Sequence, residues 1–258
     1  RAPNAPDFKN ISVTQLGGAP DLQETQENGE FQYGTIGEGA ESYKVVTYGR
    51  IVAFSRQAMI NDDLRAFDRL ISAFASAARR MENRLVYQQL TANAAMADGT
   101  ALFHANHGNL AGSGAVISAT TLGTGRTAMR TQKGLASEEL NITPSYLIVP
   151  AKQEQLAYQF TSAQFVPAQT SNVNEFRQGG RTALEPVIEP YLDSNSATAW
   201  YLAGDGTACD TVEYCWLDGS EGVYIESELG FDVDGLKLKA RLDFGAKTTD
   251  YRALYKNP

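Results

Sequence analysis

The two histidines of the chain, His104 and His107, lie three residues apart in a glycine-rich stretch. Imidazole nitrogens can bind zinc or iron, and Asp98 in the same stretch could add a carboxylate oxygen. A protein metal site needs three or four ligands, and neither an H-E-x-x-H nor a C-x-x-C pattern accompanies this pair. We therefore expect both histidines to stabilise the loop or to contact another chain. A metal-dependent hydrolase that uses His104 and His107 remains a distant alternative.

The other reactive side chains form no recognisable catalytic group. Cys209 and Cys215 lie six residues apart, and two buried or idle thiols are favoured over a disulfide, although the sequence leaves both open. No G-x-S-x-G or P-loop pattern is present, and the glycines at 123 and 125 are misplaced for a dinucleotide fold. We predict a protein that is not an enzyme and that has no cofactor and no metal site.

Charge and composition narrow the class of protein further. The 258 residues carry 22 basic against 30 acidic side chains, a net charge of −8, with 43% hydrophobic residues. Such a chain repels phosphate on average, so it suits a surface beside nucleic acid better than a sequence reader. No apolar run reaches the ~20 residues that cross a bilayer, which predicts a soluble protein without a membrane partner. The sequence begins at Arg1, which fits either proteolytic processing or an end chosen for expression.

One long stretch, residues 61–93, must organise much of the fold. Its large apolar residues recur every three or four positions, which predicts one long helix with an apolar stripe. Asn61 and Asp62 are candidate N-caps. We expect Phe67, Ile71 and Phe74 to face a sheet. Arg80 and Arg84 repel each other at this spacing unless an acidic group lies nearby, and a solvated face is favoured there over a partner-binding one.

Residues 29–56 alternate in the manner of a long β-hairpin, with a turn at 37–40. Its aromatic side chains include Phe31, Tyr33 and Tyr43. An isolated two-stranded hairpin is marginal in water, so we expect it to lie against another chain. Residues 1–28 hold several prolines and glycines and are predicted to be irregular.

The second half of the chain mixes helices and strands. A strand at 145–150 runs directly into a helix at 151–163, which indicates an α/β layer. Ser118 or Thr120 could cap a helix that ends near residue 134. The segments 185–192 and 197–205 read as a strand pair, with the first at a sheet edge because of its prolines. Residues 235–248 alternate leucine with lysine or arginine, which predicts a strand with one buried face.

Several stretches resemble the major capsid proteins of tailed bacteriophages, and more specifically the Mu-type major head subunit family. They are YKVVTYGRIVAFSRQAMINDD (residues 43–63), LFHANHGNL (102–110), SYLIVP (145–150), WYLAGD (200–205) and DFGAKTTDYRALYKN (243–257). The resemblance covers nearly the whole chain from about Asp7 onward. It implies an α+β fold of the Hong Kong 97 (HK97-type) class.

The resemblance also implies a division of the chain. Residues 1–28 would form an N-terminal arm and 29–56 an extended E-loop. Residues 57–114 and 206–258 would form a peripheral domain with the spine helix at 61–93, and 115–205 an axial α/β domain. The implied candidate subunit-interface residues are Phe31, Tyr33, Tyr43, Lys44 and Arg50. Some shells of this fold join an E-loop lysine to a neighbouring subunit, and Lys44 is the candidate for that role. We expect no cross-link.

The implied function is self-assembly of hexamers and pentamers into an icosahedral shell around the phage DNA genome. Its implied partners are copies of itself, portal and decoration proteins, and packaged double-stranded DNA without sequence-specific contact. The implied locations are the virion and, during assembly, the host cytoplasm. The alternative from the same fold is an encapsulin-like nanocompartment shell, for which the sequence shows no cargo-docking groove.

Overall fold

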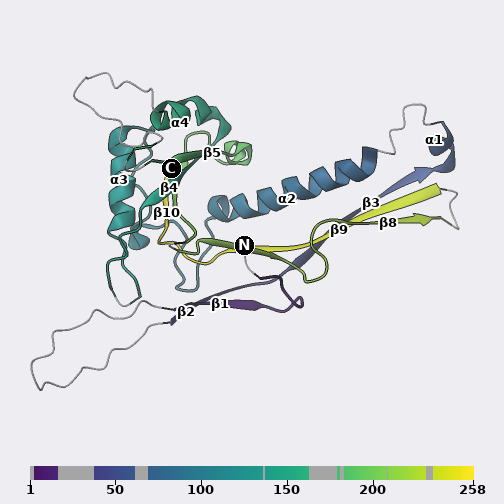
Figure 1. The fold of residues 1–258 in the computed structure, drawn as a ribbon, viewed down its shortest axis with the longest axis horizontal. Coiled ribbons are helices and arrows are strands. Elements are labelled where there is room, and N and C mark those ends of the chain that lie inside the picture. Colours follow the sequence, from purple (N-terminus) through teal and green to yellow (C-terminus); the bar gives the residue numbers. More distant parts are fainter. Residues whose placement is uncertain are drawn as a thin grey trace, which may run out of the picture. The chain divides into compact units, whose positions relative to one another are not determined.

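A computed structural model describes residues 3–16, 38–61, 69–135, 137–162, 179–180, 183–207, 209–230 and 235–258 (Figure 1). The chain divides into two compact units. The first unit consists of Arg1–Ser12, Ser42–Gln89 and Glu213–Lys247, and the second of Val13–Glu41, Leu90–Val212 and Thr248–Pro258. In the described part of the chain, no helix is long and apolar enough to cross a bilayer.

The first unit is built on the long strand β9 (Gly235–Thr248), which is the strand predicted at 235–248. It pairs antiparallel with β3 (Val46–Ser55) and with β8 (Tyr224–Leu229), and the strand order β3-β9-β7 places β7 (Val212–Trp216) on it as well. Because side chains alternate along a strand, the leucines of β9 occupy one face and its lysines the other. Leu238 and Leu242 are buried, which confirms the predicted buried face.

Helix α2 (Leu70–Ala92) confirms most of the predicted long helix. The predicted start at Asn61 is wrong, because Asn61 closes a separate short helix, α1 (Arg56–Ile60), by donating its backbone N–H to the Gln57 carbonyl at 3.0 Å. An Asn side chain suits both the start and the end of a helix, so the residue type did not show which of these boundaries Asn61 forms. Asp62, the other predicted cap, lies outside the described residues.

The apolar stripe of α2 faces the sheet of the first unit over part of its length. Phe74 and Met81 line a cavity of about 260 Å³ together with Tyr48 of β3 and Leu242 of β9. The expectation for Ile71 is wrong, because its side chain is 56% exposed. Phe67 is outside the described residues.

The N-terminal strands pair differently from the prediction. β1 (Ile11–Leu16) and β2 (Glu38–Tyr43) form a two-stranded sheet. Residues 1–28 are therefore not irregular throughout, and the predicted turn at 37–40 is wrong because Glu38 already lies in β2. The predicted return strand also divides near Lys44, and the described chain pairs β3 with β9 alone. Alternation marks a segment as a strand, but it does not identify the partner strand.

The second unit contains a four-stranded sheet with the order β10-β6-β4-β5. β4 (Pro144–Val149) runs parallel to β5 (Glu185–Ile188) and antiparallel to β6 (Trp200–Gly204), which pairs with β10 (Leu254–Asn257). β5 is an edge strand, as its prolines predicted. The predicted strand pair is wrong in one respect, because β4 lies between β5 and β6, and residues Pro190–Ser194 form the 3-10 helix η4.

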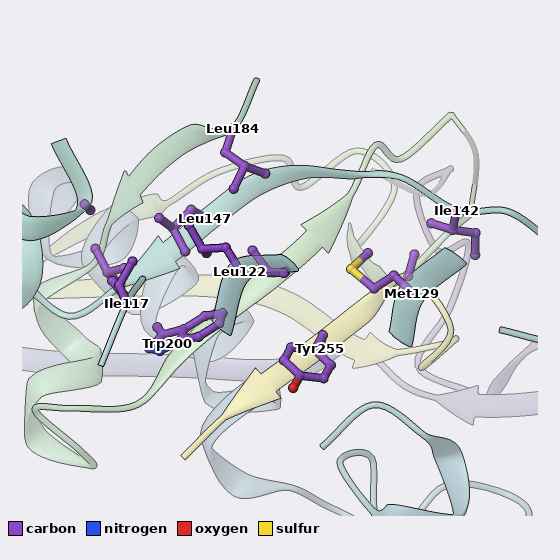
Figure 2. Close-up of a cluster of buried hydrophobic side chains, with 12 residues drawn as sticks. Ile117, Leu122, Met129, Ile142, Leu147, Leu184, Trp200 and Tyr255 are labelled. Atoms are coloured by element: carbon purple, nitrogen blue, oxygen red, sulfur yellow. The ribbon is translucent and has the colours of Figure 1, made fainter. Parts of the chain in front are cut away.

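Helices α3 (Ala119–Arg130) and α4 (Glu154–Thr161) complete the second unit (Figure 1). Ser118 caps α3 with a full capping box to Thr121, which confirms the predicted cap. The predicted helix after β4 is present as the 3-10 turn η3 (Ala151–Gln153) followed by α4. Figure 2 shows the core of this unit, whose labelled side chains are Ile117, Leu122, Met129, Ile142, Leu147, Leu184, Trp200 and Tyr255.

The two units divide the chain at other positions than the predicted peripheral and axial domains do. Residues 94–114 and 248–258 belong to the same unit as 115–205. The reason is local: the loop after α2 is bonded to the C-terminal strand, since Ala111 N–H donates to the Lys256 carbonyl and Lys256 N–H to the Asn109 carbonyl.

Candidate functional site

The histidine-containing loop closes on itself through His107, which is buried. Its Nδ1 lies 3.1 Å from the Leu102 carbonyl, and its Nε2 lies 2.7 Å from Oδ2 of Asp98. A carbonyl oxygen and an ionised carboxylate accept hydrogen bonds, so each ring nitrogen lies against an acceptor. The ring also stacks on Tyr251 at a centroid distance of 3.8 Å. Both nitrogens of His107 are therefore committed to protein partners.

Asp98 completes this contact from the surface side. Desolvation by burial opposes ionisation of its carboxyl group, but hydrogen bonds from His107 and from the Thr100 backbone amide lower its pKa below the ordinary value. The Gln132 side-chain amide donates to the His107 carbonyl at 2.8 Å. Together with the stacking on Tyr251, these bonds hold the loop to the residues just after α3 and to the segment before β10.

His104 has a separate role in the same loop. Its Nδ1 accepts a hydrogen bond from the Asn106 backbone N–H at 3.1 Å and caps the 3-10 helix η2 (Ala105–His107). Among the described residues, no three histidine, cysteine or acidic side chains are grouped as metal ligands. Both histidines therefore stabilise the loop, which is one of the two roles expected from the sequence; the other was contact with another chain.

Both cysteines are free thiols. Cys215 is fully buried in β7, and the Cys209 thiol donates to the Asp250 carboxylate at 3.2 Å. Burial, followed by the charge of Asp250, raises the pKa of Cys209 to about 12. A thiol with so high a pKa is protonated at neutral pH, so Cys209 does not have the character of a nucleophile.

Tyr43 is a core residue of the first unit, and its place at a subunit interface stays a prediction. It is 8% exposed, and its hydroxyl donates to Oε1 of Glu213 at 2.8 Å. Burial, followed by hydrogen bonds with Cys215 and Glu213, raises the pKa of this phenol. The strand alternation was correctly recognised, but it did not reveal that Tyr43 faces β7.

Lys44 and Arg50 are both exposed. Lys44 follows β2 and precedes β3, and Arg50 lies in β3 opposite Ala240 of β9. The structure thus leaves these two candidates accessible, although it does not bring them into one cluster. Phe31 and Tyr33, the remaining candidates, lie outside the described residues.

Exposed apolar side chains on this sheet were missed by the sequence reasoning. Ile51 is 61% exposed on the face that carries Lys239, and Tyr224 is 51% exposed next to Arg241. Lys239 pairs with Glu226 of β8 across this face. The sequence does not show which residue of β9 lies opposite each residue of β3. Once that pairing is known, Ile51 is recognised as exposed because it lies opposite Lys239, on the face of the lysines. This face combines paired charges with exposed apolar groups, as surfaces that contact other proteins do.

Comparisons with known proteins give a consistent result. The sequence matches the model of a family described as phage capsid protein over residues 39–257. No curated protein matches the chain.

Three solved structures that are similar to this chain come from phages. A structure from Mycobacterium phage Che8 has 12% identity and a TM-score of 0.59, and the match covers 97% of this chain and 84% of that one. The capsid of Myoviridae phage XM1 has 12% identity and a TM-score of 0.60, with 96% and 84% covered. The capsid asymmetric unit of cyanophage Pam1 has 13% identity and a TM-score of 0.61, with 98% and 85% covered. At such identities the likeness shows the fold, and it confirms the α+β capsid fold that the sequence motifs implied.

Proposed function

The chain belongs to the phage capsid protein family, and we propose that its copies assemble as hexamers and pentamers into an icosahedral shell around double-stranded phage DNA. Membership itself establishes the coarser function. The protein is a major capsid protein, a structural protein and not an enzyme, that self-assembles into a shell and resides in the virion. The symmetry of the capsomers and the enclosed DNA are the proposed part.

One observation carries the proposal. The family match extends over residues 39–257, so it includes both units of the chain and not one shared motif. The likeness in fold to the capsid of phage XM1, over 96% of this chain, agrees with it. The encapsulin-like alternative is not favoured, because the matched family is one of phage capsid proteins.

The parts of the subunit can be assigned on the same basis. The first unit, with α2 as its spine helix, corresponds to a peripheral domain, and the second unit to an axial domain. We assign the extended E-loop to residues 29–56, in whose described part β2 pairs with β1 and β3 pairs with β9. The motifs quoted from the sequence support placement within the Mu-type head subunits.

The remaining partners follow from the same role. A closed shell needs a portal vertex for DNA entry, and decoration proteins are candidate ligands of its outer surface. Assembly takes place in the host cytoplasm in this proposal. A net charge of −8 favours a container that holds DNA without reading its sequence.

Electron microscopy of the purified full chain tests the proposal. We expect closed shells with sixfold and fivefold capsomers under assembly conditions. A protein that remains monomeric across concentration, salt and crowding agents, or that forms only open tubes, contradicts it.

A paired variant tests the two accessible interface candidates. Lys44→Glu combined with Arg50→Glu should lower the yield of shells and leave thermal unfolding of the free subunit unchanged, because both side chains are exposed. Lys152→Glu, an exposed lysine of η3, serves as the control and should assemble normally. Equal yields from all three proteins contradict the assignment of Lys44 and Arg50.

A further inference from the structure

Helix α2 concentrates positive charge in an otherwise acidic protein. Its 23 residues, Leu70–Ala92, contain three arginines and one carboxylate, Glu82, whereas the whole chain has a net charge of −8. Arg79, Arg80 and Arg84 fall within two turns of one another. We call these three residues the arginine face.

The carboxylate of this helix has a hydrogen-bond partner outside the arginine face. Glu82 is half-buried, and its Oε1 accepts a hydrogen bond from Nε1 of Trp216 in β7 at 2.8 Å. All three arginines are exposed. Over the part of the chain that the structure describes, none of their guanidinium groups forms an ion pair with a carboxylate. Arg80 and Arg84, one turn apart, therefore repel each other, and no carboxylate of the described residues forms an ion pair with either of them.

The surroundings of the arginine face do not resemble a protein–protein interface. The side chains that α2 exposes around it are small or polar, namely Ser72, Ala73, Ser76, Ala77, Asn83 and Gln88. Protein–protein interfaces are usually centred on large buried side chains such as Trp and Tyr, and none of these six residues is one. Phe74 and Met81 of the helix line the cavity shared with β3 and β9, and the exposed Ile71 lies about two turns before Arg79.

We propose that the arginine face binds the phosphate backbone of duplex DNA, an inference that rests on the proposed DNA-containing shell. Guanidinium groups suit phosphate because their planar donors match its oxygens. Arg79 to Arg84 rise about 7.5 Å along the helix axis, and the phosphates of one DNA strand follow one another every ~3.4 Å, so three guanidinium groups can each contact one phosphate. The contact carries no sequence information, because no side chain needs to reach a base.

Salt dependence of DNA binding tests this inference. Unassembled full-length subunits are titrated against a fluorescein-labelled 24-base-pair duplex of mixed sequence, and anisotropy is followed from 50 to 200 mM NaCl. Three phosphate contacts contribute a slope of about −2.7 to log affinity against log salt. Over this range the affinity of the unmodified protein should therefore fall about 40-fold more than that of Arg79→Gln/Arg80→Gln/Arg84→Gln.

Two controls separate the arginine face from overall charge and from folding. Arg130→Gln/Lys152→Gln/Lys237→Gln removes the same number of exposed charges elsewhere and should keep the full slope. Replacement of the three arginines by lysine keeps the charge and should also keep the slope. Equal loss in the charge-matched control, or no loss in the glutamine variant, overturns the inference, as does an unmodified subunit that does not bind the duplex at 50 mM NaCl.

Assembly without DNA shows whether the arginine face contacts another copy of the chain instead of DNA. It also separates failure of the DNA contact from failure of the proposed shell function. The glutamine variant should form empty shells as the unmodified protein does. If it cannot, the arginine face contacts another copy of the chain and the inference fails. If the unmodified protein forms no shells, the proposed function fails, and that result is independent of the slopes. Shells that form normally, with slopes that do not differ, refute the DNA contact alone.

Discussion

Gly125 lies where helix α3 comes closest to the sheet of the second unit, and its replacement by alanine tests that packing. An ideal Cβ at this position would lie 2.7 Å from Cδ1 of Leu202 in β6 and 2.9 Å from two ring carbons of Tyr255 in β10. Carbon atoms in favourable contact are about 3.5–4.0 Å apart. The added methyl group therefore requires the sheet residues or the helix to move.

The magnitude follows from a comparison within the same helix. Gly123 lies one position before Thr124 in α3, and a Cβ built there meets no atom within 4 Å. Gly123→Ala should stabilise the protein by about 1 kcal/mol, the difference in helix propensity. Gly125→Ala gains the same propensity but adds overpacking of about 1–3 kcal/mol. The variant should thus be neutral to destabilised by about 2 kcal/mol, and the two substitutions should differ by about 1–3 kcal/mol.

Urea unfolding of unassembled subunits provides the measurement, with circular dichroism reporting helix content and fluorescence reporting the surroundings of the two tryptophans, Trp200 and Trp216. Trp200 is fully buried and its ring lies 6.3 Å from that of Tyr255. The ring of Tyr255 therefore has little freedom to yield. If Gly125→Ala raises stability as much as Gly123→Ala does, the close approach of α3 to β6 and β10 is refuted.

Three further predictions concern the loop, the thiols and the shell. Hydrogen bonds lower the pKa of Asp98, so its ionised form stabilises the fold above the ordinary pKa of ~3.9, and this contribution is lost as pH falls through the lowered value. Asp98→Asn should therefore lower the thermal midpoint at pH 7, with a difference that narrows from pH 5 toward pH 3; a constant difference contradicts the pairing with His107. Cys209 and Cys215 should react with iodoacetamide at pH 8 only after denaturation, as followed by intact mass, because one thiol is buried and the other has a pKa of about 12. Assembled particles should give one band near 28.0 kDa on a denaturing gel, and a ladder that Lys44→Ala removes would show cross-linking.

Some elements of this protein are determined by short stretches of its sequence. The strand Gly235–Thr248 follows from alternation of leucine with lysine and arginine, because one face of a strand is buried and the other is wet. The start of α3 follows from Ser118, whose hydroxyl satisfies a free amide of the first turn. The body of α2 follows from its apolar period. Each of these sequence patterns extends over a few neighbouring residues, so it predicts its element without knowledge of the segment that packs against it.

Tertiary structure decided which segments meet. β3 could have continued a hairpin with the preceding residues, yet it pairs with β9, nearly 200 residues further along the chain. The local pattern of β3 is compatible with either partner, and only the burial of a complete sheet favours one. Tyr43 became a core residue for the same reason, since β7 and Glu213 cover it.

The histidine pair shows the same limit in a side chain. The spacing of His104 and His107 permits metal binding, loop capping or contact with another chain, because imidazole serves all three. The fold places Asp98, the Leu102 carbonyl and Tyr251 around His107, and that surrounding assigns it to the loop. Residue types thus determined which interactions were available, while the position of distant segments determined which were made, since a hydrogen bond or a packed contact forms only where the chain brings both partners within a few ångströms.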